Sequence, residues 1–303
     1  MSTGVILQPG QLEAPAGNIP FLHLPVRANL FKDRAARFRQ LAVSHKLGDF
    51  LEFMASLAEA QHAALMHFPK VPLPDTAQLA LSREHGMPAL AARSWPRDPA
   101  WRKVLHEIAD RVYTEAQKSV REAITHLRTL DDASLEKLAD AILDGRFHDA
   151  DLAASPFAAA ALQVYWTHMA TTLGPAAFDR TDLPNLCPVC ASSPVGSIVR
   201  IGSEQGLRYL HCSLCSSEWH MVRAKCSNCE STKGIAYYTI EGDKGAVKAE
   251  SCEACGSYLK ILYLEKDPLL DPTADDLATL ALDILMDEAG VRRSGPNLFL
   301  LSA

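Results

Sequence analysis

The chain has no cysteine outside one span of 69 residues, no long hydrophobic run and no excess of positive charge. Its longest apolar stretches, 157–162 and 277–286, are far shorter than the roughly 20 residues that a membrane-spanning helix needs. Residues 1–20 lack the basic start and the apolar core of a secretory signal peptide. Together these absences predict a cytoplasmic protein.

Motifs of the common catalytic and nucleotide-binding sites are also missing. No G-x-G-x-x-G, P-loop or H-E-x-x-H pattern occurs, and no cysteine remains as a nucleophile if all eight bind metal. Acidic residues such as Asp131 and Asp132, or Glu52 and Glu59, usually cap or coat helices. We therefore expect no enzymatic activity, no catalytic residues and no organic cofactor.

The charge balance argues against nucleic acid as a partner. The formal net charge is −6, whereas nucleic-acid-binding proteins are usually basic. Within 187–264 basic side chains exceed acidic ones by one, but eight thiolates and two divalent ions would make this stretch net negative. A zinc ribbon that binds nucleic acid is therefore the least favoured interpretation.

All eight cysteines occur as C-x-x-C pairs. The pairs are Cys187/Cys190, Cys212/Cys215, Cys226/Cys229 and Cys252/Cys255. Because Cys226 follows Cys187 by 39 residues and Cys252 follows Cys212 by 40, the pattern is a tandem repeat. Two C-x-x-C turns at the ends of a hairpin present four sulfurs to one ion. The spacing predicts two metal sites, in which all eight cysteines are ligands.

The residues between the pairs have the pattern of β-hairpins. Segments 197–201 and 207–210 flank the turn 202–206, and segments 235–240 and 246–249 flank the turn 242–245. Each copy continues into a further strand-like segment, 219–222 or 258–264.

Metal binding explains the cysteine pattern better than disulfides or redox chemistry do. A disulfide framework needs an oxidising compartment, and four C-x-x-C pairs in register form no redox relay. Four thiolates suit zinc or iron, and ligand identity does not choose between them. His211 and His220 lie beside the second pair, but four thiolates already close a shell.

The rest of the chain divides into further regions by its periodicity. We expect an extended arm at 1–26, a helical domain at 27–183, metal modules at 184–225 and 226–266, and a C-terminal helix and tail at 267–303. The helical pattern places Phe31 and Phe38 inside and Arg34 and Arg37 elsewhere. Within the domain it predicts one long helix over 101–127, and a later helix that packs Tyr165 and Trp166 in the core. A single last helix over 273–290, with a capping box at its start, and a loose tail from 292 complete the prediction.

Several stretches resemble the family of the formate dehydrogenase accessory protein FdhE. They are 161–166, 187–190, 206–215, 218–229, 257–263 and 293–297, and the resemblance extends from about residue 25 onward. It implies an α+β fold with an N-terminal helical domain, two tandem rubredoxin-like or zinc-ribbon-like modules and a C-terminal helix. It also implies rubredoxin-type iron at the eight cysteines, with zinc as the alternative. Rubredoxin knuckles usually continue with glycine, and here only Cys255 is followed by one, Gly256.

The resemblance implies an accessory or assembly factor that binds the catalytic subunit of formate dehydrogenase before export. The alternative is a rubredoxin-like electron carrier to that enzyme. Neither nucleic acid nor stable membrane insertion is expected, and self-association into a homodimer is left open. Among the aromatic residues near the cysteines, which include Tyr209, Tyr237, Tyr238 and Tyr258, we expect Trp219 to be an exposed contact with the client.

Overall fold

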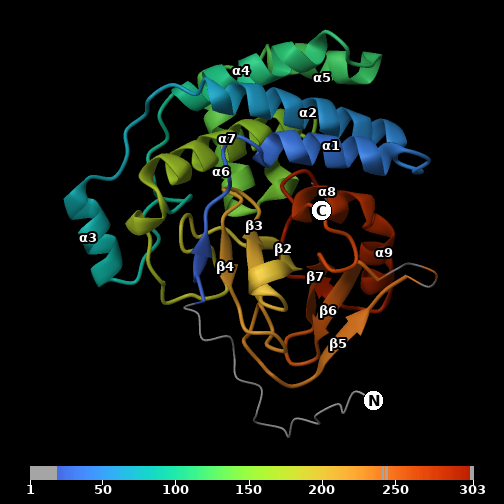
Figure 1. Ribbon diagram of the computed structural model, residues 1–303. Coiled ribbons are helices and arrows are strands. Elements are labelled where there is room, and N and C mark those ends of the chain that lie inside the picture. The colour runs from blue at the N-terminus through green and yellow to red at the C-terminus, as the bar shows by residue number, and fades with distance from the viewer. Residues whose placement is uncertain (1–18, 241, 243–244, 301–303) are drawn as a thin grey trace, which may run out of the picture.

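In the computed structural model, which describes residues 19–240, 242 and 245–300, a layer of helices lies over a single β-sheet (Figure 1). The helices of this layer are α1 (Leu30–Ala42), α2 (Gly48–Met66), α3 (Thr76–Glu84), α4 (Ala100–Tyr113), α5 (Lys118–Leu127), α6 (Asp132–Asp144) and α7 (Ser155–Leu173). Helix α7 is buried almost all round, as expected of a helix with little polar surface. Helices α2, α4 and α6 pack against it, and Tyr165 and Trp166 lie in this core as predicted.

The helix predicted over 101–127 is two helices, so that prediction is wrong. Helix α4 ends at Tyr113 and α5 begins at Lys118. The Thr114 hydroxyl donates to the carbonyl oxygen of Arg111 at 3.0 Å, and such bonds compete with helix continuation. Because the apolar spacing continues on both sides of the break, periodicity alone did not reveal it. The short helix α3, capped by Asp75, was not anticipated.

The strands form one mixed sheet in the order β1-β4-β3-β2-β7-β6-β5, with β8 on β7. Their bounds are β1 (Leu22–His23), β2 (Pro194–Val199), β3 (Arg208–Cys212), β4 (Glu218–His220), β5 (Ile235–Tyr238), β6 (Val247–Cys252), β7 (Ser257–Tyr263) and β8 (Arg292–Arg293). Both predicted hairpins are present, as β2/β3 and β5/β6. Each is followed by a third antiparallel strand, β4 or β7.

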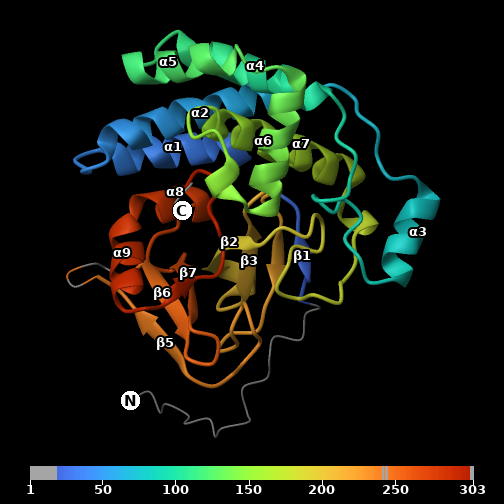
Figure 2. The same cartoon turned by 180° about the vertical axis from the view of Figure 1, so that it is seen from behind.

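The two repeats share this sheet because β2 of the first pairs in parallel with β7 of the second. In this junction Ser197 lies opposite Ile261, and Val199 lies opposite Tyr263. Beyond the first repeat, β1 pairs with β4 and covers that edge (Figure 2). Part of the predicted arm is therefore a strand, and its residues 1–18 lie outside the described range.

The chain after the second repeat folds back onto the sheet and the helical layer. It forms α8 (Pro272–Ala278) and α9 (Leu280–Glu288) in place of the single helix predicted. The break at Thr279 has a cause: the buried ammonium of Lys260 donates to the carbonyl oxygens of Asp276 and Thr279, at 2.9 and 3.1 Å. The N-cap of α8 is Asp271, so the predicted capping box is also wrong.

The described part of the C-terminal tail, residues 292–300, packs against the rest of the protein, contrary to the prediction. The Asn297 amide donates to Asp276 Oδ2 at 2.9 Å, and the side chains of Leu298 and Phe299 are buried. Gly295 approaches β2 so closely that a Cβ atom there would lie 1.8 Å from the carbonyl oxygen of Pro194. The predicted tail is thus part of the core, apart from residues 301–303, which lie outside the described range.

Buried ion pairs connect α1 to α8. Arg34 binds Asp271 at 3.1 Å, and Arg37 binds Asp275 at 2.5 Å. Both arginines are almost fully buried, although helical periodicity had placed them away from the apolar face. Among the described helices, none combines the length and the hydropathy needed to cross a bilayer.

Candidate metal centres

The structure gathers the eight cysteines into two groups of four, in each of which the sulfurs lie within 4.8 Å of one another. The groups are Cys187, Cys190, Cys212 and Cys215, and Cys226, Cys229, Cys252 and Cys255. None of these cysteines forms a disulfide. Four sulfurs about 2.3 Å from a central ion would be about 3.8 Å apart. The closest sulfur pairs, at 3.4–3.7 Å, fit that shell, so each group could hold one metal ion.

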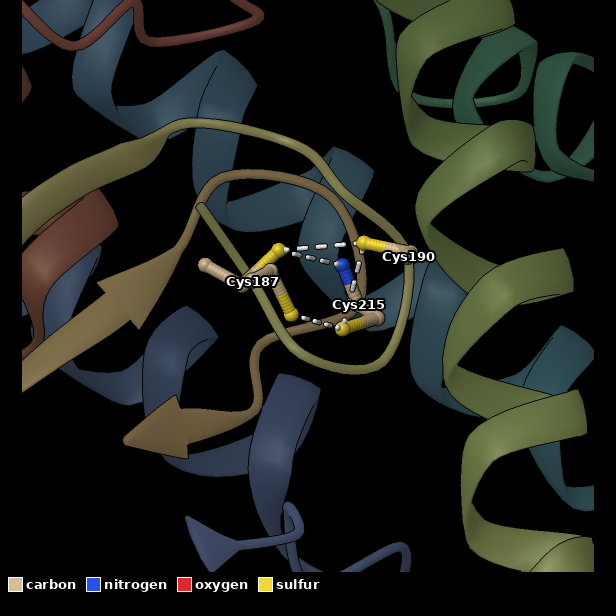
Figure 3. A group of neighbouring side chains, drawn as sticks. Cys187, Cys190 and Cys215 are labelled. Carbon is tan, nitrogen blue, oxygen red and sulfur yellow. Dashed lines mark hydrogen bonds between the residues drawn. The ribbon is translucent and has the colours of Figure 1, made fainter. Parts of the chain in front are cut away.

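The first group is enclosed by protein on every side. In Figure 3 the sulfurs of Cys187, Cys190 and Cys215 face one another. The Cys187 and Cys190 sulfurs each lie 3.6 Å from that of Cys215. All four cysteines of the group have an exposed fraction of 0%, and they belong to the main hydrophobic core of the helical layer.

Hydrogen bonds attach the loops of the first group to the helical layer. The amide nitrogens of Leu90 and Ala92 donate to the carbonyl oxygens of Val189 and Cys190, at 3.0 and 2.9 Å. From α7, the Gln163 side chain donates to Ser213 at 2.8 Å. Thr167, one turn further, donates to the Cys215 carbonyl at 3.4 Å. Sequence reasoning missed both, although polar residues spaced by four in an apolar helix were a usable signal.

The second group lies at the protein surface. Cys226 and Cys252 are buried, whereas Cys229 is exposed and Cys255 is half-buried. The sulfurs of Cys226 and Cys255, and those of Cys229 and Cys252, are 3.7 Å apart. An ion here would be accessible to solvent and to other molecules through Cys229.

The residue after each C-x-x-C pair adopts the left-handed backbone conformation that favours glycine, although only one of the four is glycine. The residue after each pair has a positive φ: 61° at Ala191, 56° at Ser216, 62° at Glu230 and 64° at Gly256. A residue other than glycine pays about 1–2 kcal/mol for this conformation. In return, the turn directs amide groups at sulfur, as when Cys215 N donates to Cys212 Sγ at 3.4 Å. Such bonds stabilise a thiolate.

Each group contains one thiol with a lowered pKa beside others whose pKa is raised. In the first, burial opposes ionisation of Cys190, but hydrogen bonds led by the one with Cys187 outweigh it and hold its pKa well below the usual thiol value. Burial raises the pKa of Cys187 and of Cys212 well above the usual thiol value. In the second group, burial raises the pKa of Cys226 to about 12. Burial also opposes ionisation of Cys255, but hydrogen bonds led by Ser257 outweigh it and lower the pKa to about 6. A bound cation must displace the remaining thiol protons, so metal affinity should rise with pH.

Neither histidine near the cysteines joins a sulfur group. His211 Nδ1 lies 3.1 Å from Glu218 Oε1, and His220 packs edge-on against Tyr209. The expectation that Trp219 is an exposed contact is wrong. Its exposed fraction is 4%, because β1 covers it and its indole N–H donates to the Pro184 carbonyl at 2.8 Å.

The remaining aromatic residues near the cysteines divide into two kinds. Tyr209 and Tyr258 are buried, whereas the exposed fractions of Tyr237 and Tyr238 are 43% and 47%. The two exposed tyrosines are consecutive residues of β5 and are therefore the available aromatic contacts.

Known proteins resemble this chain over most of its length. Family models for the N-terminal part of FdhE, its central domain and its C-terminal domain match residues 19–181, 186–223 and 224–300. Protein FdhE of Salmonella arizonae is 44% identical over 94% of this chain and 92% of that protein. The FdhE homologue of Cronobacter sakazakii is also 44% identical, over 93% of this chain and 91% of that protein. The crystal structure of FdhE from Pseudomonas aeruginosa matches with a TM-score of 0.85 and 42% identity, covering 93% of this chain and 99% of that chain.

Proposed function

This chain belongs to the FdhE family, and we propose that it is an accessory factor needed to produce active formate dehydrogenase. In this proposal it acts in the cytoplasm and binds the catalytic subunit of that enzyme before export. It supplies a metal-containing scaffold and carries out no catalysis itself.

The complete burial of the first cysteine group carries the non-enzymatic part of this proposal. The eight cysteines bind two ions, with iron favoured and zinc as the alternative. A closed shell of four thiolates leaves no open coordination position for a substrate. Because the first group has an exposed fraction of 0%, its ion holds the helical layer and the sheet together instead of meeting a reactant.

The exposed second group favours a second candidate function, electron transfer to the client. Cys229 brings that site to the surface, where a partner's redox centre could approach. This function requires iron there, because zinc does not change its oxidation state. Anaerobically purified protein that shows no reversible redox signal would exclude it without affecting the scaffold role.

The proposed partner is a protein. The net charge of −6 gives no general attraction to nucleic acid. Self-association into a homodimer remains compatible with the proposal. In this proposal the chain consists of a helical domain at 27–183, metal modules at 184–225 and 226–266, and a C-terminal region at 267–303.

Co-purification with a tagged catalytic subunit of formate dehydrogenase tests the proposal. We expect the immature subunit to retain the wild-type protein, and deletion of the protein to abolish formate oxidation in cells. A C229S/C255S variant that still binds but yields inactive enzyme would favour electron transfer. If no subunit is retained and deletion leaves the activity intact, the proposal is wrong.

A further inference from the structure

Strand β5 is the outermost strand at one end of the sheet (Figure 1). Within the described residues it pairs with β6 alone, whereas β1 covers the opposite edge by pairing with β4. Its sequence, IAYY, contains no charge and no proline, which are the usual protections of an edge strand. Two half-exposed tyrosines lie on this unprotected edge.

The internal repeat provides a strand equivalent to β5. In the first repeat, Ser197 of β2 lies opposite Leu210, two residues before Cys212. In the second, Tyr237 of β5 lies opposite Glu250, two residues before Cys252. Tyr237 therefore has the structural position of Ser197, and Tyr238 has that of Ile198.

In the first repeat another strand occupies the equivalent edge. Strand β7 pairs with β2 in parallel there, and Leu264 N donates to the Val199 carbonyl at 3.2 Å. With this strand in place, Ser197 is fully buried and Ile198 has an exposed fraction of 5%. The same edge of β5 has tyrosine side chains and no added strand among the described residues.

The backbone groups of β5 are oriented for such an addition. The amide of Glu253 donates to the carbonyl of the opposite residue, Gly234, at 2.9 Å. Because hydrogen-bonded and non-bonded pairs alternate in an antiparallel ladder, Ala236 and Tyr238 bond to β6. The amide and carbonyl groups of Ile235 and Tyr237 therefore point outward. The two tyrosine side chains project on opposite faces of the sheet, so both would flank an added strand.

We propose that β5 binds an extended segment of the client polypeptide as an added parallel strand, in the register that β7 takes on β2. This inference rests on the proposed function, since it requires a client. Main-chain hydrogen bonds would give affinity, and apolar side chains of the segment would pack on Tyr237 and Tyr238. An immature client exposes such segments before it folds.

A second copy of this chain fits the edge less well. Besides β5, the strands at the sheet edges of the other copy are β1 and β8, and each is only two residues long. Antiparallel pairing of two β5 strands would join only four residues from each copy. A stable dimer usually buries about 1,200 Å² or more, which so short a pairing does not provide.

The substitution Tyr237→Pro tests the inference by removing one outward N–H group and leaving the bonds to β6 in place. Tyr237→Phe is the matched control, because it keeps the amide and the ring. Each protein is titrated with the purified full-length catalytic subunit of formate dehydrogenase in its immature form, and hydrogen exchange of β5 is followed. We expect slower exchange at β5 when the subunit binds the wild type, equal binding by Tyr237→Phe, and binding about tenfold weaker by Tyr237→Pro.

The outcomes separate this inference from the proposed function. If the subunit binds all three proteins equally and exchange at β5 is unchanged, the docking inference is wrong and the accessory role stands. If the wild type binds no subunit, both fail. If hydrogen exchange at β5 is slow in the protein alone and becomes faster on dilution, a second copy occupies the edge and the docking inference is wrong. If Tyr237→Pro loses bound metal, its weaker binding would have a structural cause. The hydrogen exchange of β5 in the wild type then decides whether the docking inference holds.

Discussion

The side-chain amide of Gln163 donates to the carbonyl oxygen of Ser213 across 2.8 Å, inside the loop between Cys212 and Cys215. The side-chain oxygen of Gln163, Oε1, in turn accepts from Gln61 Nε2 at 3.0 Å. A continuous chain of buried polar contacts therefore runs from α2 through α7 to the first metal centre. We expect this centre and the helical layer to unfold together.

Replacing Gln163 by leucine should destabilise the whole protein. The Ser213 carbonyl would remain buried without its donor, which costs about 1–3 kcal/mol in the free energy of unfolding. Chemical denaturation of metal-loaded protein measures the change. Gln205→Leu, at an exposed position, is the control and should have little effect. Equal stability of the two variants would show that the contact contributes nothing.

Loss of the two metal centres should have unequal consequences. The double variant C187S/C190S should bind one ion per chain and lose the cooperative unfolding transition of the helical layer, because its site lies in that core. The variant C226S/C229S should also bind one ion and keep that transition. Metal analysis and calorimetry measure both effects. A variant that loses both ions, or neither, would contradict the assignment of four cysteines to each site.

Chelators should remove the two ions at different rates. Cys229 is exposed, so a chelator can attack the second site directly, whereas all four cysteines of the first site have an exposed fraction of 0%. We expect a fast release of one ion, followed by a slow release limited by unfolding. Stopped-flow measurements with a coloured chelator will resolve the phases. The fast phase should be absent from C226S/C229S, and a single phase in the wild type would refute the difference in access.

Stability should fall in mild acid because of His168. Burial, and then the charge of Arg27, lower the pKa of this histidine to about 4. The unfolded chain takes up this proton near pH 6.5, so the contribution is complete above that pH and is lost as pH falls towards 4. The loss amounts to about 2–3 kcal/mol. His168→Gln keeps an acceptor for Arg27 and does not titrate, so its free energy of unfolding should decline less between pH 6.5 and 4.

Gly295→Ala should dislodge the C-terminal segment. The new Cβ atom would lie 1.8 Å from the Pro194 carbonyl oxygen, which is a backbone atom of β2, and 2.8 Å from Leu259 Cδ1, which belongs to a buried side chain. We expect a loss of about 2–3 kcal/mol or more. The control Gly202→Ala meets nothing within 4 Å and should cost only about 1 kcal/mol for its positive φ. Thermal unfolding of both variants will show whether close packing at Gly295 is the larger effect.

The grouping of the cysteines could be predicted because it depends on short-range geometry. A C-x-x-C turn directs two sulfurs to one point, and the hairpin between two such turns brings the other pair to it. The turn at 202–206 and the alternation around it likewise gave the correct β2/β3 pairing. For the same reason, helical spacing placed Tyr165 and Trp166 in the core.

The features that sequence reasoning missed depend on residues far apart in the chain. Trp219 is buried because β1 arrives from the N-terminal region to cover it. The last helix breaks at Thr279 because Lys260, on β7, takes the carbonyl oxygens there. The parallel pairing of β2 with β7 likewise joins two repeats that each look complete alone. No local pattern encodes such contacts.

Pairing of β1 with β4 sets a constraint on the timing of folding. Leu22 pairs with Trp219, and Arg34 binds Asp271 across 237 residues of sequence. At synthesis rates of about 5–20 residues per second, the ribosome needs roughly 10–40 seconds to deliver the partner of β1. Strand β1 therefore cannot take its place in the sheet until β4 has been synthesised, and α1 cannot complete its ion pairs until residue 275 has been made.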